Sequence, residues 1–102
     1  MMIVTGSVRA RPETAEEVLA LCLQHVELSR LESGCLLHSV HRDVEDPHRL
    51  VFLEHWTDGP SLAAHFALPA PIELVTRVSE LASEPPVMDA FEATRLDPAA
   101  LA

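Results

Sequence analysis

The spacing of hydrophobic residues changes along this chain in an order that constrains its fold more than any other feature. Side chains alternate over residues 3–9, which predicts a short strand. Apolar residues then recur at helical spacing from Ala15 to Val26, and Gly34 is expected to terminate that helix. Residues 35–43 and 49–56 form the next two strand candidates, and the short connection between them indicates a hairpin.

The second half of the chain changes from helix back to strand. Residues 58–60 provide an Asp cap and an early proline, which predict a short helix that must stop before Pro69. Another helix is expected to begin at Pro71 and to end at the Pro85-Pro86 pair. Residues 87–96 are the last strand candidate.

The resulting order, β-α-β-β-α(α)-β, is that of the ferredoxin-like split βαβ fold in the α+β class. It predicts a four-stranded antiparallel sheet with helices on one face only. A bare apolar face usually marks a contact with a partner, so we expect a two-fold dimer in which sheet packs on sheet. The 102 residues allow one domain, which we place at residues 1–96, followed by a C-terminal tail at 97–102.

The charge of the chain excludes several kinds of partner. Seven arginines and no lysines stand against 16 acidic residues, which gives a net charge of −9. Binding to nucleic acid or to an anionic membrane depends on clustered basic residues, so neither is expected. We find no signal peptide and no run of about 20 apolar residues, and the sequence therefore predicts a cytoplasmic protein.

Six histidines are the most numerous candidates for chemistry. His38 and His41 are three apart on a predicted strand, so their rings should lie on opposite faces. No H-E-x-x-H or C-x-x-C motif is present, and no metal site is predicted. His65 stands between apolar neighbours on the short helix, where lining a pocket and filling the core are about equally expected.

Glu54 and Trp56 are the other candidates, because they share one face of the most apolar strand. A carboxylate there must find a partner or border a cavity. Burial would raise the pKa of Glu54 and suit it to general acid or base catalysis, whereas an ion pair with an arginine is an equal alternative. Trp56 is either a core residue or a flat wall for a planar ligand.

Four sequence elements stand together in order and spacing between residues 31 and 66. They are Glu32-Ser33-Gly34-Cys35, Asp43-Val44-Glu45-Asp46-Pro47, Glu54-His55-Trp56 and His65-Phe66. In this the chain resembles the antibiotic biosynthesis monooxygenase (ABM) domain family, including its quinol monooxygenase-like members. With the flanking strands and helices, the resemblance covers roughly residues 2–96.

The resemblance implies a dimeric α+β barrel with a ligand cavity between sheet and helices in each subunit. It also implies a cofactor-independent monooxygenase that oxidises a small aromatic, phenolic or quinol-type substrate with O₂. His65 or Glu54 would assist deprotonation of the substrate. Trp56 and Phe52 or Phe66 would hold its ring, and His38, within the matching segment, is counted with these substrate-binding residues.

The chain lacks Asn and Tyr, the side chains on which the best-studied members of that family depend. This leaves His65, Glu54 and Trp56 as the catalytic candidates. One alternative is an isomerase on the same scaffold, acting on a phosphorylated substrate that would need arginines. Another is a non-catalytic ligand-binding dimer. An enclosed pocket bordered by Trp56 and His65 would favour the enzymes, and bulky side chains filling that space would favour the binding protein.

Overall fold

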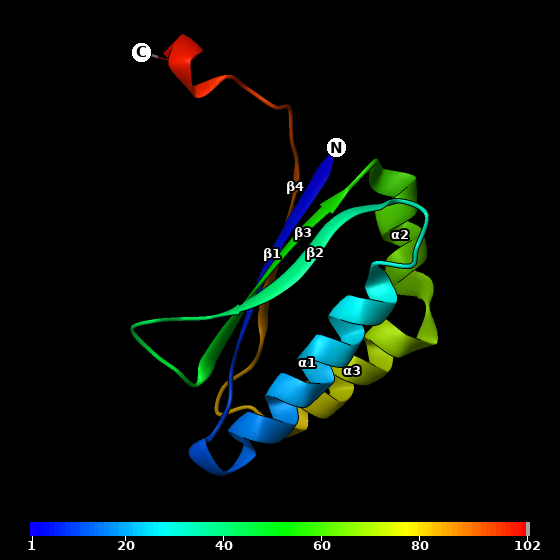
Figure 1. Ribbon diagram of the computed structural model, residues 1–102. Helices are drawn as coiled ribbons and strands as arrows, with labels where there is room; N and C mark the ends of the chain where they lie inside the picture. Colours follow the sequence, from blue (N-terminus) through cyan, green and yellow to red (C-terminus); the bar gives the residue numbers. More distant parts are fainter. Residues whose placement is uncertain (102) are drawn as a thin grey trace.

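The computed structural model describes residues 1–101, which form one sheet and three helices (Figure 1). Short 3₁₀ turns at Pro12–Thr14 and Pro98–Leu101 precede the first helix and follow the last strand. The strands and helices are, in chain order, β1 (Met2–Arg9), α1 (Ala15–Ser29), β2 (Cys35–Arg42), β3 (Arg49–Trp56), α2 (Gly59–Ala67), α3 (Pro69–Leu81) and β4 (Val87–Glu92).

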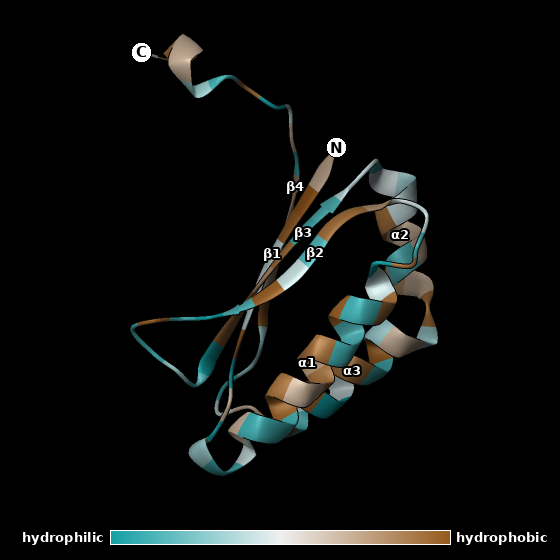
Figure 2. Cartoon of the chain, viewed as in Figure 1, coloured by the Kyte–Doolittle hydropathy of each residue, from teal (hydrophilic) through white to brown (hydrophobic). Residues whose placement is uncertain are grey.

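The sheet is antiparallel throughout, with the strand order β2-β3-β1-β4. This confirms the predicted ferredoxin-like α+β fold. All three helices lie on one side of the sheet, and the other face is bare (Figure 1). Hydrophobic and hydrophilic residues alternate along α1 and α3, as amphipathic helices on a sheet require, and the β2–β3 connection is mostly hydrophilic (Figure 2).

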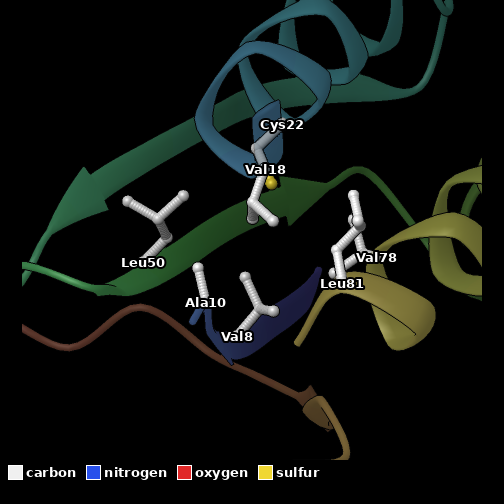
Figure 3. Close-up of a cluster of buried hydrophobic side chains, with 7 residues drawn as sticks. All are labelled: Val8, Ala10, Val18, Cys22, Leu50, Val78 and Leu81. Atoms are coloured by element: carbon white, nitrogen blue, oxygen red, sulfur yellow. The ribbon is translucent and has the colours of Figure 1, made fainter. Parts of the chain in front are cut away.

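The buried hydrophobic side chains form two separate clusters on the covered face of the sheet. The larger cluster joins the first half of α1 and the C-terminal end of α3 to β1 and β3 (Figure 3). The smaller cluster fixes α2 over the other end of the sheet through Val4, Trp56 and Leu62. Members of the larger cluster are Val8, Ala10, Val18, Cys22, Leu50, Val78 and Leu81.

The bare face carries apolar side chains that a single chain leaves partly in water. Val51 and Leu53 of β3 are half-buried, although the apolar run of this strand predicts burial on both faces. Leu37 of β2 and Phe91 of β4 are 38% and 53% exposed. His41 also lies on this side, whereas His38 is buried on the covered side, as their spacing predicts.

The ends of α1 and β4 differ from the prediction. α1 ends at Ser29, five residues before Gly34, and a turn closed by the Glu32 N–H to Ser29 carbonyl bond of 3.1 Å follows it. β4 ends at Glu92 and not at residue 96, and one further pair of main-chain bonds joins Ala93 to Met1, with the Ala93 N–H 2.8 Å from the Met1 carbonyl oxygen. The predicted tail contains a 3₁₀ turn, and the division of the chain at residue 96 stays a prediction.

α3 differs at both ends, because it begins at Pro69 and not at Pro71, and it ends at Leu81 and not at the Pro85-Pro86 pair. Both Pro69 and Pro71 fit in the first turn of a helix, where the missing N–H has no partner to lose. Within residues 1–101, no helix is both long and apolar enough to cross a membrane.

Candidate active site

A cavity of about 530 Å³ lies between the sheet and the helices. Its walls are almost entirely apolar, and Glu54 and His65 are among its few polar residues. Ile72, Val75 and Met88 on its rim are about half exposed, so the cavity opens to solvent between α3 and β4. The complete lining is Gly6, Ser7, Val8, Cys22, His25, Phe52, Glu54, His65, Phe66, Pro71, Ile72, Leu74, Val75, Thr76, Val78, Pro86, Val87 and Met88.

Among the polar groups on the cavity wall, His65 is held in place by a short contact with a carboxylate. Its ring is buried in α2, and its Nδ1 lies 2.7 Å from Oε2 of Glu32 in the turn after α1. Such a short distance to a carboxylate fixes the proton on Nδ1 and leaves Nε2 as an acceptor. The pair therefore has the arrangement of a general base held in position by a carboxylate.

Two features of the sequence bring Glu32 and His65 together. Asp58 caps α2 by accepting a hydrogen bond of 2.8 Å from the Ser61 N–H, which fixes where the helix begins. Gly34 lies against the Ser61 side chain with no room for a Cβ atom, so the turn after α1 can approach α2 closely. The role of Glu32 was not predicted, although its place in the Glu32–Cys35 element of the family resemblance was a usable signal.

Glu54 is held by two partners on the covered face of the sheet. The Trp56 indole N–H donates to its Oε1 at 3.0 Å, and His38 Nε2 lies 3.2 Å from the same oxygen. Burial alone would raise the pKa of Glu54, but the His38 ring and the Trp56 N–H together outweigh it and lower the pKa. This corrects the expectation of a raised pKa, and Glu54 is an anchored carboxylate and not a ready proton donor.

The predicted site residues divide into two groups. His65, Glu54, Phe52 and Phe66 lie together on the cavity wall. Trp56 and His38 do not line it, because both are completely buried behind that wall. Trp56 instead packs against the His65 ring at a centroid distance of 4.6 Å. The structure thus differs from the expectation that these two residues contact a ligand: they support the residues that border the cavity.

Three histidines, from α1, β2 and α2, lie close together beside Glu54. His25 of α1 joins His38 and His65, with ring centroids 5.4 Å from each of them. Burial lowers the pKa of His25 to about 4, and the neighbouring His38 and His65 rings add to the effect. His25 was not predicted as a site residue. Its position three residues after Cys22 on the apolar stripe of α1 was the available signal.

Comparison with known proteins agrees with these observations. The family model described as antibiotic biosynthesis monooxygenase matches residues 1–84, which include the complete candidate site except the β4 side of the cavity. An uncharacterised protein of Synechocystis sp. is 31% identical over 84 residues, or 82% of this chain. The chain spans 57% of that relative's length.

Solved structures with the same fold include three at more than 25% identity, of which two are described here. A Deinococcus radiodurans protein assigned to the antibiotic biosynthesis monooxygenases is 28% identical, with a TM-score of 0.90 over 95% of this chain and 96% of its own. A conserved protein of Methanosarcina mazei is 26% identical, with a TM-score of 0.85 over 91% and 92% of the two chains.

Proposed function

Because the chain belongs to the antibiotic biosynthesis monooxygenase family, we propose that it is a monooxygenase that oxidises a small phenolic or quinol-type aromatic with O₂. The observation that carries this proposal is the His65–Glu32 pair on the wall of an apolar cavity. The free Nε2 of His65 is available to take a proton from a ligand, and the rest of the cavity would hold that ligand by apolar contacts.

The chemistry needs little more than a positioned base. His65 Nε2 accepts the hydroxyl proton of the substrate, and Glu32 stabilises the imidazolium that forms. The electron-rich phenolate then transfers electrons to O₂, and a new C–O bond forms on the ring. One oxygen atom stays in the quinone product, and the other leaves as water with the two hydrogens that the substrate loses. The substrate itself is therefore the reductant.

The cavity favours this substrate class over a phosphorylated one. The Phe52 and Phe66 rings border it, and a planar aromatic ring packs well against such side chains. No arginine occurs among the described residues that line it, so a phosphate group would find no cationic partner. The isomerase alternative is thereby disfavoured. Of the two residues expected to border an enclosed pocket, His65 does and Trp56 does not, and the open volume argues only against a protein whose side chains fill the space.

Oxygen consumption with a panel of hydroquinones and naphthols tests the proposal. We expect His65→Gln to lower kcat by about 100-fold or more with at least one substrate, as removal of a general base does. His48→Gln is the matched control, because His48 lies in the β2–β3 connection away from the cavity. Absence of oxygen uptake with every substrate, or full turnover by His65→Gln, would overturn the proposal.

We also propose that two copies form a dimer through their bare sheet faces. Support comes from Val51, Leu53, Leu37 and Phe91, which a sheet-on-sheet contact would bury. Light scattering should give the mass of two chains, and Leu53→Glu should give the mass of one. Val44→Glu in the exposed β2–β3 connection is the control and should remain dimeric. A wild-type monomer contradicts the proposal.

A cytoplasmic location belongs to the same proposal. Cys22 and Cys35 are both free thiols, which suits a reducing compartment. Fractionation of cells that produce the tagged chain should recover it with cytosolic markers.

A further inference from the structure

We propose that His25, His38 and His65 form a binding site for one divalent transition metal ion that prefers imidazole ligands, with Zn²⁺ as the representative ion. One ring nitrogen of each histidine lies within 4.8 Å of the others. The proposal concerns binding of the metal alone, and because His65 Nε2 would be both the ligand and the base described above, a bound ion would prevent this nitrogen from taking a substrate proton. It departs from the sequence prediction of no metal site, because α1, β2 and α2 each contribute one ligand and leave no local motif.

The distances need only small adjustments to bind an ion. Tetrahedral Zn²⁺ with Zn–N bonds of about 2.0–2.1 Å requires nitrogens about 3.3 Å apart, so the rings must approach by at most about 1.5 Å. His25 is half-buried and less enclosed than the other two rings. It therefore has the most room to adjust its position.

His38 provides independent support, because its Nδ1 is a buried polar atom with no partner, whereas its Nε2 contacts Glu54. Its side chain is 0% exposed, and neither ring nitrogen has a hydrogen-bond partner among residues 1–101. Its Nε2 lies 3.2 Å from Glu54 Oε1 but outside hydrogen-bonding geometry. A buried polar group left unpaired costs about 1–3 kcal/mol. A metal ion bound to its Nδ1 would remove that cost.

The surroundings of the three rings match those of known metal ligands. A histidine that binds a metal almost always donates its other ring N–H to a carboxylate or another acceptor. His65 Nδ1 lies 2.7 Å from Glu32, and His38 Nε2 faces Glu54. Ser29 Oγ lies 3.4 Å from His25 Nε2 and donates its own proton to the His25 carbonyl at 2.7 Å. Each ring therefore keeps one nitrogen for a metal.

The ligand set also selects the kind of ion. Three neutral imidazoles suit Zn²⁺, Cu²⁺, Ni²⁺ or Fe²⁺, whereas Mg²⁺ and Ca²⁺ require oxygen ligands. His25 and His65 both line the cavity, so an ion among the three rings would border the space that holds a ligand. Three histidines with one open position are a known arrangement for catalytic zinc.

Titration of the chelator-treated full chain with Co²⁺ tests the site directly. We expect one Co²⁺ per chain, with the strong visible absorption of a four-coordinate ion, and its loss when Zn²⁺ is added. Zn²⁺ should also raise the Tm of the chain, because it binds the folded state. Chains that show no Co²⁺ absorption and no rise in Tm with Zn²⁺ would overturn the proposal.

Variants assign the ligands. His25→Gln and His38→Gln should each abolish the Co²⁺ spectrum, Glu32→Gln should weaken binding by about 10–100-fold, and His48→Gln should bind as the wild type does. If His38→Gln does not fold, as judged by circular dichroism, the His25→Gln variant still tests the assignment, because His25 is only half-buried. Unchanged binding in His25→Gln, or loss of binding in His48→Gln, refutes the assignment. These measurements use no substrate, so the metal-site proposal can be refuted without refuting the proposed oxidation.

Discussion

Replacing Gly34 with alanine should destabilise the fold through one contact. A Cβ atom at this position would overlap Cβ and Oγ of Ser61 and would lie 3.3 Å from Thr57 Oγ1. Overpacking of this kind costs about 1–3 kcal/mol. The Ser61 Cβ is attached directly to the backbone of α2 and cannot rotate away, so we expect a loss of about 2–3 kcal/mol. In a domain of this size that lowers the Tm by roughly 10–20 °C.

Urea denaturation measures this loss, and two further variants show its cause. Gly59→Ala is the matched control, because nothing lies within 4 Å of its added Cβ, and it should leave the stability within about 0.5 kcal/mol of wild type. Ser61→Gly removes both overlapping atoms, so Gly34→Ala should cost little in that background. Equal losses with and without the Ser61 side chain, or a Gly34→Ala chain as stable as Gly59→Ala, would refute the reasoning.

Three other predictions follow from single contacts at the site. Glu32→Gln should lower kcat about 10–100-fold while the fold is kept, because His65 loses the carboxylate that orients its ring, and steady-state kinetics with circular dichroism checks this. Trp56→Phe should lower the free energy of unfolding by about 1–3 kcal/mol, measured in urea, because the buried Glu54 loses a hydrogen-bond donor. Burial raises the pKa of Cys22 to about 12, so at pH 8 Ellman's reagent should modify this thiol only after unfolding.

The fold was predictable from local patterns because each element buries one face against its neighbours. Alternation in residues 3–9 and the apolar run at 49–56 identify two central strands, and prolines mark where the later helices begin. Boundaries were less predictable where tertiary contacts set them. Gly34 does not end α1 but lets the turn after it pack closely against Ser61 of α2, and α3 ends at Leu81, next to the bridge between Ala82 and Ala10.

The site was predictable only in part, because its geometry depends on contacts between distant residues. His65 and Glu54 were identifiable as polar residues in apolar segments. Glu32 is 33 residues from His65 in sequence, and only the packing of α2 against the turn after α1 joins them. The pKa of Glu54 was predicted in the wrong direction, because burial was visible in the sequence and the two partners that oppose it were not.

The division of the hydrophobic interior into two clusters has a consequence for how the chain opens. Glu54 lies on β3 between Leu50 of the larger cluster and Trp56 of the smaller one, and besides the sheet only local contacts such as Glu32–His65 hold α2 to the rest of the described residues. Hydrogen exchange should therefore reveal two levels of protection in the helices, with α2 amides exchanging through a partial opening that leaves α1 and α3 protected. Such an opening would admit small molecules at the α2 end of the cavity without global unfolding.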